Sequence, residues 1–295
     1  MSIALDYSPP DPALLSGTVD LHIHTAPDIF PRNVTAISAA EEAKRLGMAA
    51  IVVKSHSTDT AARAQTAREI TGFPVFGGVV LNYAVGGLNE YAVLETARQG
   101  GRIVWMPTIN ARHFIENSAG APMLAKAIPP GVSGLTATEN GRLLPAAGRV
   151  LDAIAEHGLT LATGHLHPGE SLLVATEAAR RGIRRVIVTH PHVPFVGMSP
   201  AVAAQLADTG AFIEVTDHEP VKDRVEMIRT VGAGRCFLST DGGTVSGPPP
   251  ATRLSSFIQA LLEEGFAAAE VRHMSADLPG YLIGLAGEHC PELHA

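Results

Sequence analysis

Residues 19–28 read VDLHIHTAPD, and the first six of them decide how the rest of the chain is interpreted. Apolar residues alternate there with Asp20, His22 and His24. Because successive side chains of a β-strand point to opposite faces, this alternation predicts a strand that carries both imidazoles on one face, at its end. Whether the two imidazoles share a partner depends on what lies at the ends of the other strands.

Seven further short apolar or β-branched runs follow, separated by alanine-rich amphipathic segments. The eight runs span residues 18–24, 49–56, 74–82, 101–108, 159–165, 185–190, 211–216 and 236–241. Near-continuous apolar runs are typical of parallel strands buried on both faces. Seven intervening segments have helical patterns that stop at or just before a glycine: residues 35–46, 58–70, 88–99, 146–157, 168–181, 199–209 and 219–231. Eight β/α alternations predict an α/β fold, a (β/α)8 TIM barrel.

The length and composition fit one such domain. A barrel of this kind needs about 250 residues, so residues 1–295 are expected to form a single domain. Hydrophobic residues make up 46% of the chain and charged residues 17%, which excludes disorder. The net charge of −7 and the absence of a basic run argue against a nucleic-acid partner. We expect a small-molecule substrate instead, and homo-oligomers are common among such barrels.

The sequence also bears on location. The N-terminus has neither the basic nor the apolar region of a signal peptide, and no apolar run reaches the ~18 residues that a membrane helix needs. The two cysteines are expected to be reduced thiols. These features predict a cytoplasmic protein that makes no membrane contact.

One stretch interrupts the alternation. Residues 110–145 form a Gly- and Pro-rich insertion after the fourth run, and Asn140-Gly141 within it predicts a two-residue hairpin turn. An insertion at the C-terminal end of a barrel strand overhangs the active-site face. It is therefore either a cover for the substrate or a tolerated loop.

Polar residues gather where the predicted strands end. These residues are His22, His24, Lys54, His56, His165, His190 and Asp241. In a barrel all C-terminal strand ends meet at one mouth, so residues far apart in sequence come together there. Four of these histidines and one carboxylate make a zinc-type site with an open coordination position, namely His22, His24, His165, His190 and Asp241. Arg32, Asn82, Asn110 and Arg112 are expected at the same mouth, as candidates for substrate binding.

Several roles stay open on residue type alone. His56 is a metal ligand, a substrate contact or a structural residue. A buried lysine near a cation needs an anion or must lose its charge. Lys54 therefore holds an anion of the substrate or protein, Asp20 and Glu214 among them, or it is carbamylated and bridges two metals. Three further histidines lie in loops just past strands. They are expected to contact the metal ligands without binding the metal, or to face solvent: His167, His192 and His218.

These motifs carry a family resemblance. DLHIH, the histidines that end the fifth and sixth runs, and STDGG resemble the amidohydrolase superfamily of metal-dependent hydrolases, over about residues 17–287. APDIFPR, KSH and ATGHLHPGE are similar to a largely uncharacterised bacterial subgroup of it. The resemblance implies that His22, His24, His165, His190 and Asp241 bind metal, and that Asp241 also moves the catalytic proton.

The chain departs from the superfamily pattern in one respect. Members with two metals usually carry a bridging lysine or glutamate on the third or fourth strand, but here those runs end in VLN and WMPT. This leaves one ion, or a second ion held by Lys54 or His56. The expected cofactor is a divalent metal, Zn²⁺ before Mn²⁺ or Fe²⁺.

The resemblance implies a metal-dependent hydrolase that uses an activated water to cleave an amide, cyclic amide or ester bond of a small substrate, with anionic substrates among the candidates. One alternative is a metal-dependent decarboxylase on the same barrel. Another is a phosphoesterase of the polymerase-and-histidinol-phosphatase type, which also opens with Asp-x-His-x-His. That family continues with Thr-Asp-His after the second strand, where this chain reads KSHSTD. A barrel that keeps the metal without catalysis is disfavoured, because structural zinc sites are closed.

Overall fold

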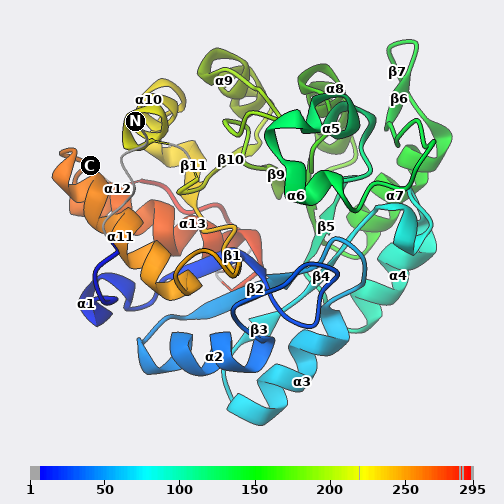
Figure 1. Ribbon diagram of the computed structural model, residues 1–295. Coiled ribbons are helices and arrows are strands. Elements are labelled where there is room, and N and C mark those ends of the chain that lie inside the picture. The colour runs from blue at the N-terminus through cyan, green and yellow to red at the C-terminus, as the bar shows by residue number, and fades with distance from the viewer. Residues whose placement is uncertain (1–6, 219, 286, 288, 294–295) are drawn as a thin grey trace.

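The computed structural model describes residues 7–218, 220–285, 287 and 289–293. Short parallel strands form the centre, and helices surround them (Figure 1). The central strands are β1 (Val19–His24), β2 (Ala50–Lys54), β3 (Val75–Phe76), β4 (Gly78–Val80), β5 (Ile103–Trp105), β8 (Thr160–Ala162), β9 (Val186–Val188), β10 (Phe212–Val215) and β11 (Cys236–Leu238). Each lies within one of the eight predicted runs, and β3 and β4 share the third. The predicted α/β fold with parallel strands is therefore confirmed.

The helices follow the predicted segments closely. The outer helices are α2 (Ala36–Arg45), α3 (Ala61–Thr71), α4 (Glu90–Arg98), α7 (Pro145–Glu156), α8 (Pro168–Arg180), α9 (Pro200–Asp208), α10 (Val221–Val231) and α11 (Pro250–Glu263). Short helices α1 (Pro12–Leu15), α12 (Ala268–Arg272) and α13 (Leu278–Leu282) complete the set, with a π-helical turn at His273–Asp277. The glycine ends are as expected: Gly72 is left-handed, with φ 64°, and its N–H bonds to Arg68 in the last turn of α3.

The strands form two parallel sheets rather than one continuous ladder. Their orders are β1-β2-β3 and β11-β10-β9-β8-β5-β4. Gly77 joins β3 to β4, and a Cβ there would lie 2.3 Å from the Thr60 carbonyl oxygen, so only glycine fits this junction. At the other junction Ile23 bridges Gly242, and the N–H of His24 donates to the Gly242 carbonyl at 2.9 Å. Strand pairing within the described residues is interrupted at both places, and barrel closure is not detected.

Both faces of the strands are buried, as the apolar runs predict. One layer, which includes Ile51, Val104 and Leu161, packs with the outer helices. The other layer lies on the inner face of the strands and includes Val52 and Trp105. Helix α13 packs against this inner layer through side chains such as Leu278 and Tyr281. No helix among the described residues has the length and apolar character needed to cross a membrane.

The insertion contains α5 (Arg112–Asn117), α6 (Pro122–Ala125) and a hairpin of β6 (Thr138–Glu139) and β7 (Arg142–Leu143) that projects from the edge of the molecule (Figure 1). Asn140 and Gly141 form the hairpin turn with φ values of 49° and 70°, which confirms the predicted turn.

Glu170 of α8 holds the insertion in place. Its Oε1 accepts hydrogen bonds from the backbone N–H groups of Ala137 and Thr138, at 2.9 and 3.1 Å, and from the Thr138 hydroxyl. We expect Glu170→Ala to release this segment, so that limited proteolysis cuts within residues 118–139 at least about tenfold faster than in the parent. Glu170→Gln keeps an acceptor oxygen and is the matched control. Equal cleavage of Glu170→Ala and the parent would contradict this anchoring role.

Candidate metal centre

Five histidines from four strand ends form a closed circuit of rings. His22 and His24 end β1, His56 follows β2, His165 follows β8, and His190 follows β9. Going round the circuit in the order 22, 24, 56, 165, 190 and back to 22, neighbouring ring centroids lie 5.2, 4.7, 6.2, 5.0 and 5.6 Å apart. All five side chains are buried. The fold therefore brings together the histidines that the sequence placed at strand ends.

Asp241 completes this cluster from the loop after β11. Its Oδ1 lies 2.9 Å from His22 Nε2 and 3.1 Å from His24 Nε2. Asp241 and His190 have positive φ angles of 45° and 22°, which are uncommon for residues other than glycine and often occur at functional sites. One ligand atom from each of His22, His190 and Asp241 lies within 4.8 Å of the other two.

The ring nitrogens fit a metal ion. The buried Nδ1 atoms of His165 and His190 have no hydrogen-bond partner among the described residues. A buried polar atom without a partner is costly, so such atoms are few in folded proteins. Imidazole nitrogens together with a carboxylate oxygen are a donor set that divalent zinc prefers. The residues present therefore fit a divalent cation.

Glu214 of β10 supports two members of the cluster. Its Oε1 lies 2.9 Å from His22 Nδ1 and accepts a hydrogen bond from the Ser239 hydroxyl, and its Oε2 accepts from the backbone N–H of His190 at 3.0 Å. Burial opposes ionisation of Glu214, but His22 outweighs it and the pKa is lowered to about 2. The ionised carboxylate therefore holds a proton on His22 Nδ1 and leaves Nε2 to face the cluster centre.

Glu214→Gln should weaken metal binding without removing a ligand. Loss of the carboxylate leaves the tautomer and ring orientation of His22 less well fixed, and such outer partners typically contribute about 10- to 100-fold to metal affinity. We expect a fall in metal affinity in that range, measured by competition with a chromogenic chelator. Glu226→Gln, on the outer helix α10, is the matched control. Equal affinities in the parent and Glu214→Gln would show that Glu214 does not orient His22.

Asp20 ties β1 to the end of β11. Its Oδ2 accepts a hydrogen bond from the Thr240 hydroxyl at 2.6 Å, and its Oδ1 accepts from the backbone N–H groups of His22 and Thr240. Burial raises the pKa of Asp20 to about 6 in spite of these bonds. Asp20 therefore fixes the backbone that carries His22 and Asp241, and its hydrogen-bond partners among the described residues are His22 and Thr240 rather than Lys54.

Lys54 points into the cluster. Its Nζ lies 2.8 Å from His22 Nε2 and 5.2 Å from the centroid of the Trp105 ring, and only 1% of the residue is exposed. Burial lowers the pKa of Lys54 to about 8.

His56 is held by a small polar network. Its Nδ1 lies 2.9 Å from the Thr108 hydroxyl, which accepts a hydrogen bond from Asn82 Nδ2 at 2.8 Å. Asn82 also donates to the His56 carbonyl. The Thr108 hydroxyl donates to His56 Nδ1 when the ring proton is on Nε2, and accepts from it when the proton is on Nδ1. Burial keeps the pKa of His56 well below its usual value, so the ring is neutral.

The four predicted substrate-binding residues have different surroundings. Arg32 lines the cavity described below, but its Nε and Nη2 bind Asp28 Oδ2 at 2.7 and 2.6 Å. Asn82 belongs to the His56 network. Asn110 accepts from the backbone N–H of Tyr83, and its buried Nδ2 has no partner among the described residues. Arg112 is exposed and does not line the cavity. Substrate contacts by these four residues stay predictions.

Sequence reasoning missed the partners of His218. His218 Nε2 lies 3.1 Å from Asp241 Oδ2, and its Nδ1 lies 3.3 Å from Arg253 Nη2. Arg253 in turn binds both carboxylate oxygens of Asp217. Because arginine only donates, His218 Nδ1 accepts and Nε2–H donates to Asp241. The segment TDHEP after the seventh run carried the only signal, a histidine directly after a strand end.

Asp241 stays ionised in this setting. Burial opposes its charge, but the neighbouring His22 and the hydrogen bond from His218 hold the pKa well below its usual value. The carboxylate is therefore an anionic acceptor at the mouth of the cluster.

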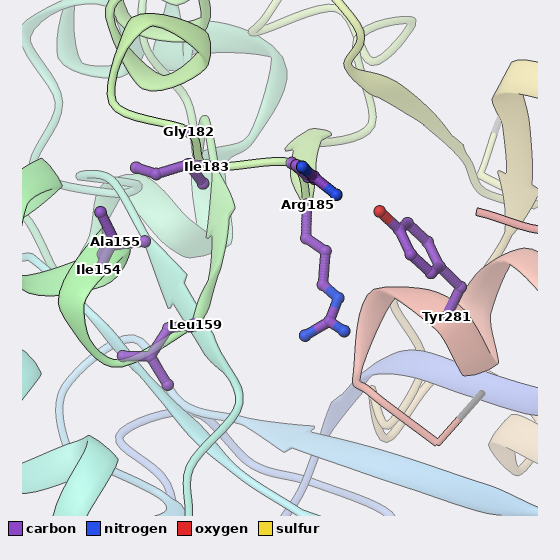
Figure 2. Close-up of a pocket in the computed structure, with 9 residues that line it drawn as sticks. Ile154, Ala155, Leu159, Gly182, Ile183, Arg185 and Tyr281 are labelled. Carbon is purple, nitrogen blue, oxygen red and sulfur yellow. The ribbon is translucent and has the colours of Figure 1, made fainter. Parts of the chain in front are cut away.

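A cavity of about 360 Å³ opens above the cluster. His24, His56 and Asp241 form its floor, and residues 121–124 of the insertion and 193–195 after β9 form a wall. Part of the insertion thus lines the cavity. A separate pocket of about 350 Å³ lies at the opposite ends of β8 and β9, where Arg185 lies between Tyr281 and Leu159 (Figure 2). That pocket contains none of the clustered histidines.

The family comparison covers most of this site. A family model described as "Family of unknown function (DUF6282)" matches residues 17–214. The chain belongs to this family. The DUF6282 match includes all five clustered histidines, Lys54 and Glu214, whereas Asp241 lies beyond it. A search of curated proteins found no match.

Solved structures share the fold. An amidohydrolase from Pseudomonas aeruginosa has 13% identity and a TM-score of 0.62, over 93% of this chain and 99% of that one. An organophosphorus hydrolase from Deinococcus radiodurans has 15% identity and a TM-score of 0.57, over 92% and 94%. A 2,6-dihydroxybenzoate decarboxylase from Rhizobium has 12% identity and a TM-score of 0.56, over 92% and 100%. At this identity the likeness shows the fold alone, and it agrees with the amidohydrolase resemblance of the sequence.

Proposed function

We propose that this protein is a metal-dependent hydrolase whose centre is formed by His22, His24, His165, His190 and Asp241, on eight parallel strands that close into a (β/α)8 barrel. The observation that carries the proposal is the convergence of ligand atoms from His22, His190 and Asp241 within 4.8 Å of one another. The buried, unpartnered ring nitrogens beside them support it further. Zn²⁺ is the proposed ion, because histidine nitrogens dominate the donor set.

Such an ion, when bound, acts as a Lewis acid that polarises a carbonyl group and lowers the pKa of water from about 15.7 to about 7. Asp241 is the only carboxylate among the described residues that line the cavity. It is therefore the group placed to accept the proton of the attacking water and to return it to the leaving group. The hydrogen bond from His218 Nε2–H orients the Asp241 carboxylate for this transfer.

His56 has a different role in this proposal. Its ring is neutral, and in the tautomer with the proton on Nε2 its Nδ1 accepts a hydrogen bond from the Thr108 hydroxyl. His56 also lines the cavity. We assign it as a hydrogen-bond donor to the negative charge that develops on the substrate during attack, a function that typically contributes about 10²–10³ in kcat.

The cavity favours hydrolysis over decarboxylation. A substrate carboxylate that lies away from the metal centre needs a positive charge of the protein, but the one arginine among the described cavity residues is already paired with Asp28. A phosphoesterase of the polymerase-and-histidinol-phosphatase type favours three metal ions. The described residues contain one group of three clustered ligands, which fits one ion rather than three.

The proposal is tested with a panel of neutral esters, cyclic esters and amides. The protein is assayed as purified, after dialysis against a chelator, and after return of Zn²⁺, Mn²⁺ or Fe²⁺. We expect hydrolysis that the chelator abolishes and that about one equivalent of metal restores. Carbon dioxide release from aromatic acids without hydrolysis would favour the decarboxylase, and activity that survives complete metal removal would contradict the proposal.

A further inference from the structure

The cavity above the metal centre has two chemically different ends. Four of its polar lining residues, His24, His56, His218 and Asp241, belong to the cluster or contact it, and Arg32 and Thr244 line it as well. The far wall consists of apolar residues, namely residues 121–124 of the insertion and 193–195 of the loop after β9. Phe195 links the two ends, because its ring centroid lies 4.9 Å from that of His165 and 5.8 Å from that of His190.

Away from the metal centre, the permanent positive charge among the described cavity residues is balanced by a neighbouring carboxylate. Among its described lining residues Arg32 alone carries a permanent positive charge. The Arg32 and Asp28 side chains are 2% and 0% exposed and bind each other in a charge-assisted pair. Lys54 lies within the histidine cluster and does not line the cavity. A carboxylate at the apolar end would lose its water without gaining a partner, which is costly.

The cavity volume limits the size of the substrate. The cavity of about 360 Å³ therefore accommodates only a small molecule. This volume is near the lower end of the range for small-molecule sites.

We propose that the substrate of this site is an uncharged molecule with a small, compact apolar body. Its polar reacting group lies at the histidine cluster, and its body lies against Phe195 and the insertion. This inference rests on the proposed function, and it replaces the anionic substrate that the sequence left among the candidates. Burial of the apolar body supplies the binding free energy.

Three hydroxamic acids test the inference by binding rather than by turnover. Acetohydroxamic acid has the metal-binding group and almost no body, benzohydroxamic acid adds an uncharged ring, and its para-carboxy derivative adds a charge to that ring. Dissociation constants are measured by titration calorimetry on the metal-loaded protein. We expect benzohydroxamic acid to bind at least about tenfold more tightly than acetohydroxamic acid. The carboxy derivative should bind at least about tenfold more weakly than benzohydroxamic acid.

Two variants test where the apolar ring and its carboxylate bind in the cavity. Phe195→Ala should reduce the advantage of benzohydroxamic acid to about threefold or less and leave acetohydroxamic acid unchanged. Met123 lines the cavity and is 44% exposed, so Met123→Lys should fold normally. Its added charge should bring the carboxy derivative to within about threefold of benzohydroxamic acid. Ile70→Lys, at a residue 61% exposed on α3, is the matched control and should change none of the three constants.

The outcomes separate the two proposals. If acetohydroxamic acid binds but the carboxy derivative binds as tightly as benzohydroxamic acid, the uncharged substrate is overturned and the metal centre stands. An equal loss of all three ligands in Phe195→Ala would likewise overturn the placement of the body. If none of the three binds to metal-loaded protein, the proposed function is overturned, and this inference with it.

Discussion

Protein carrying His22→Ala is expected to retain less than about a tenth of the metal found in the parent protein. His22 is 0% exposed, its Nε2 faces Asp241 Oδ1 at 2.9 Å, and its Nδ1 is held by Glu214. It is therefore the best-positioned ligand of the cluster, and removal of a ligand costs more than the 10- to 100-fold typical of an outer partner. Metal content is measured by elemental analysis of protein purified without added metal or an affinity tag.

The control for this prediction is His157→Ala. His157 is the exposed residue that caps the C-terminal end of α7, away from the cluster. That variant should keep the full metal content, and circular dichroism should show that both variants are folded. Metal retained at the parent level in His22→Ala would place the ion elsewhere.

Asp241→Asn is expected to lower kcat by about 10³-fold or more at saturating metal. The amide has nearly the same shape as the carboxylate, but it cannot accept the proton of the attacking water. It also loses one of the two hydrogen-bond acceptors that face His22, His24 and His218. The measurement is a full kinetic profile on whichever substrate the panel identifies, with metal titrated until the rate no longer rises.

The matched control is Asp208→Asn, at an exposed position near the end of α9, which should have the parent kcat. The kcat of His218→Gln should lie between those of Asp241→Asn and Asp208→Asn. This substitution removes the donor that orients Asp241 but leaves the carboxylate. A loss of less than about tenfold in Asp241→Asn would assign the proton transfer to another group.

The sequence predicts the position of these residues better than their partners. Position follows from topology, because parallel strands end at one edge and strand-end histidines must meet there. The five clustered histidines and Asp241 are therefore found by reading only the ends of apolar runs. The Asn140-Gly141 turn is likewise predictable from local sequence, because it depends only on two residues that adopt positive φ angles.

Partners depend on distant contacts that no local pattern contains. Glu214 was considered only as a partner of Lys54, but it binds His22, which is 192 residues earlier. Arg32 lines the cavity, as a substrate-binding residue must, and it also pairs with Asp28 four residues earlier. The partner of Glu214, in contrast, is set by tertiary packing, because a buried charge takes the opposite charge or imidazole that the fold brings to it. Closure of the barrel likewise depends on contacts between distant segments, because it requires strand pairing at the Gly77 and Gly242 junctions.

The most direct test of the central claim is an anomalous difference map from crystals of the protein, recorded on both sides of the zinc absorption edge and repeated at the manganese and iron edges. We predict one strong peak at the C-terminal ends of the strands, about 2.0–2.2 Å from ring nitrogens of His22 and His190 and an oxygen of Asp241. A peak bound only by other residues, or no peak at the cluster in crystals soaked with each of the three metals, would contradict the account.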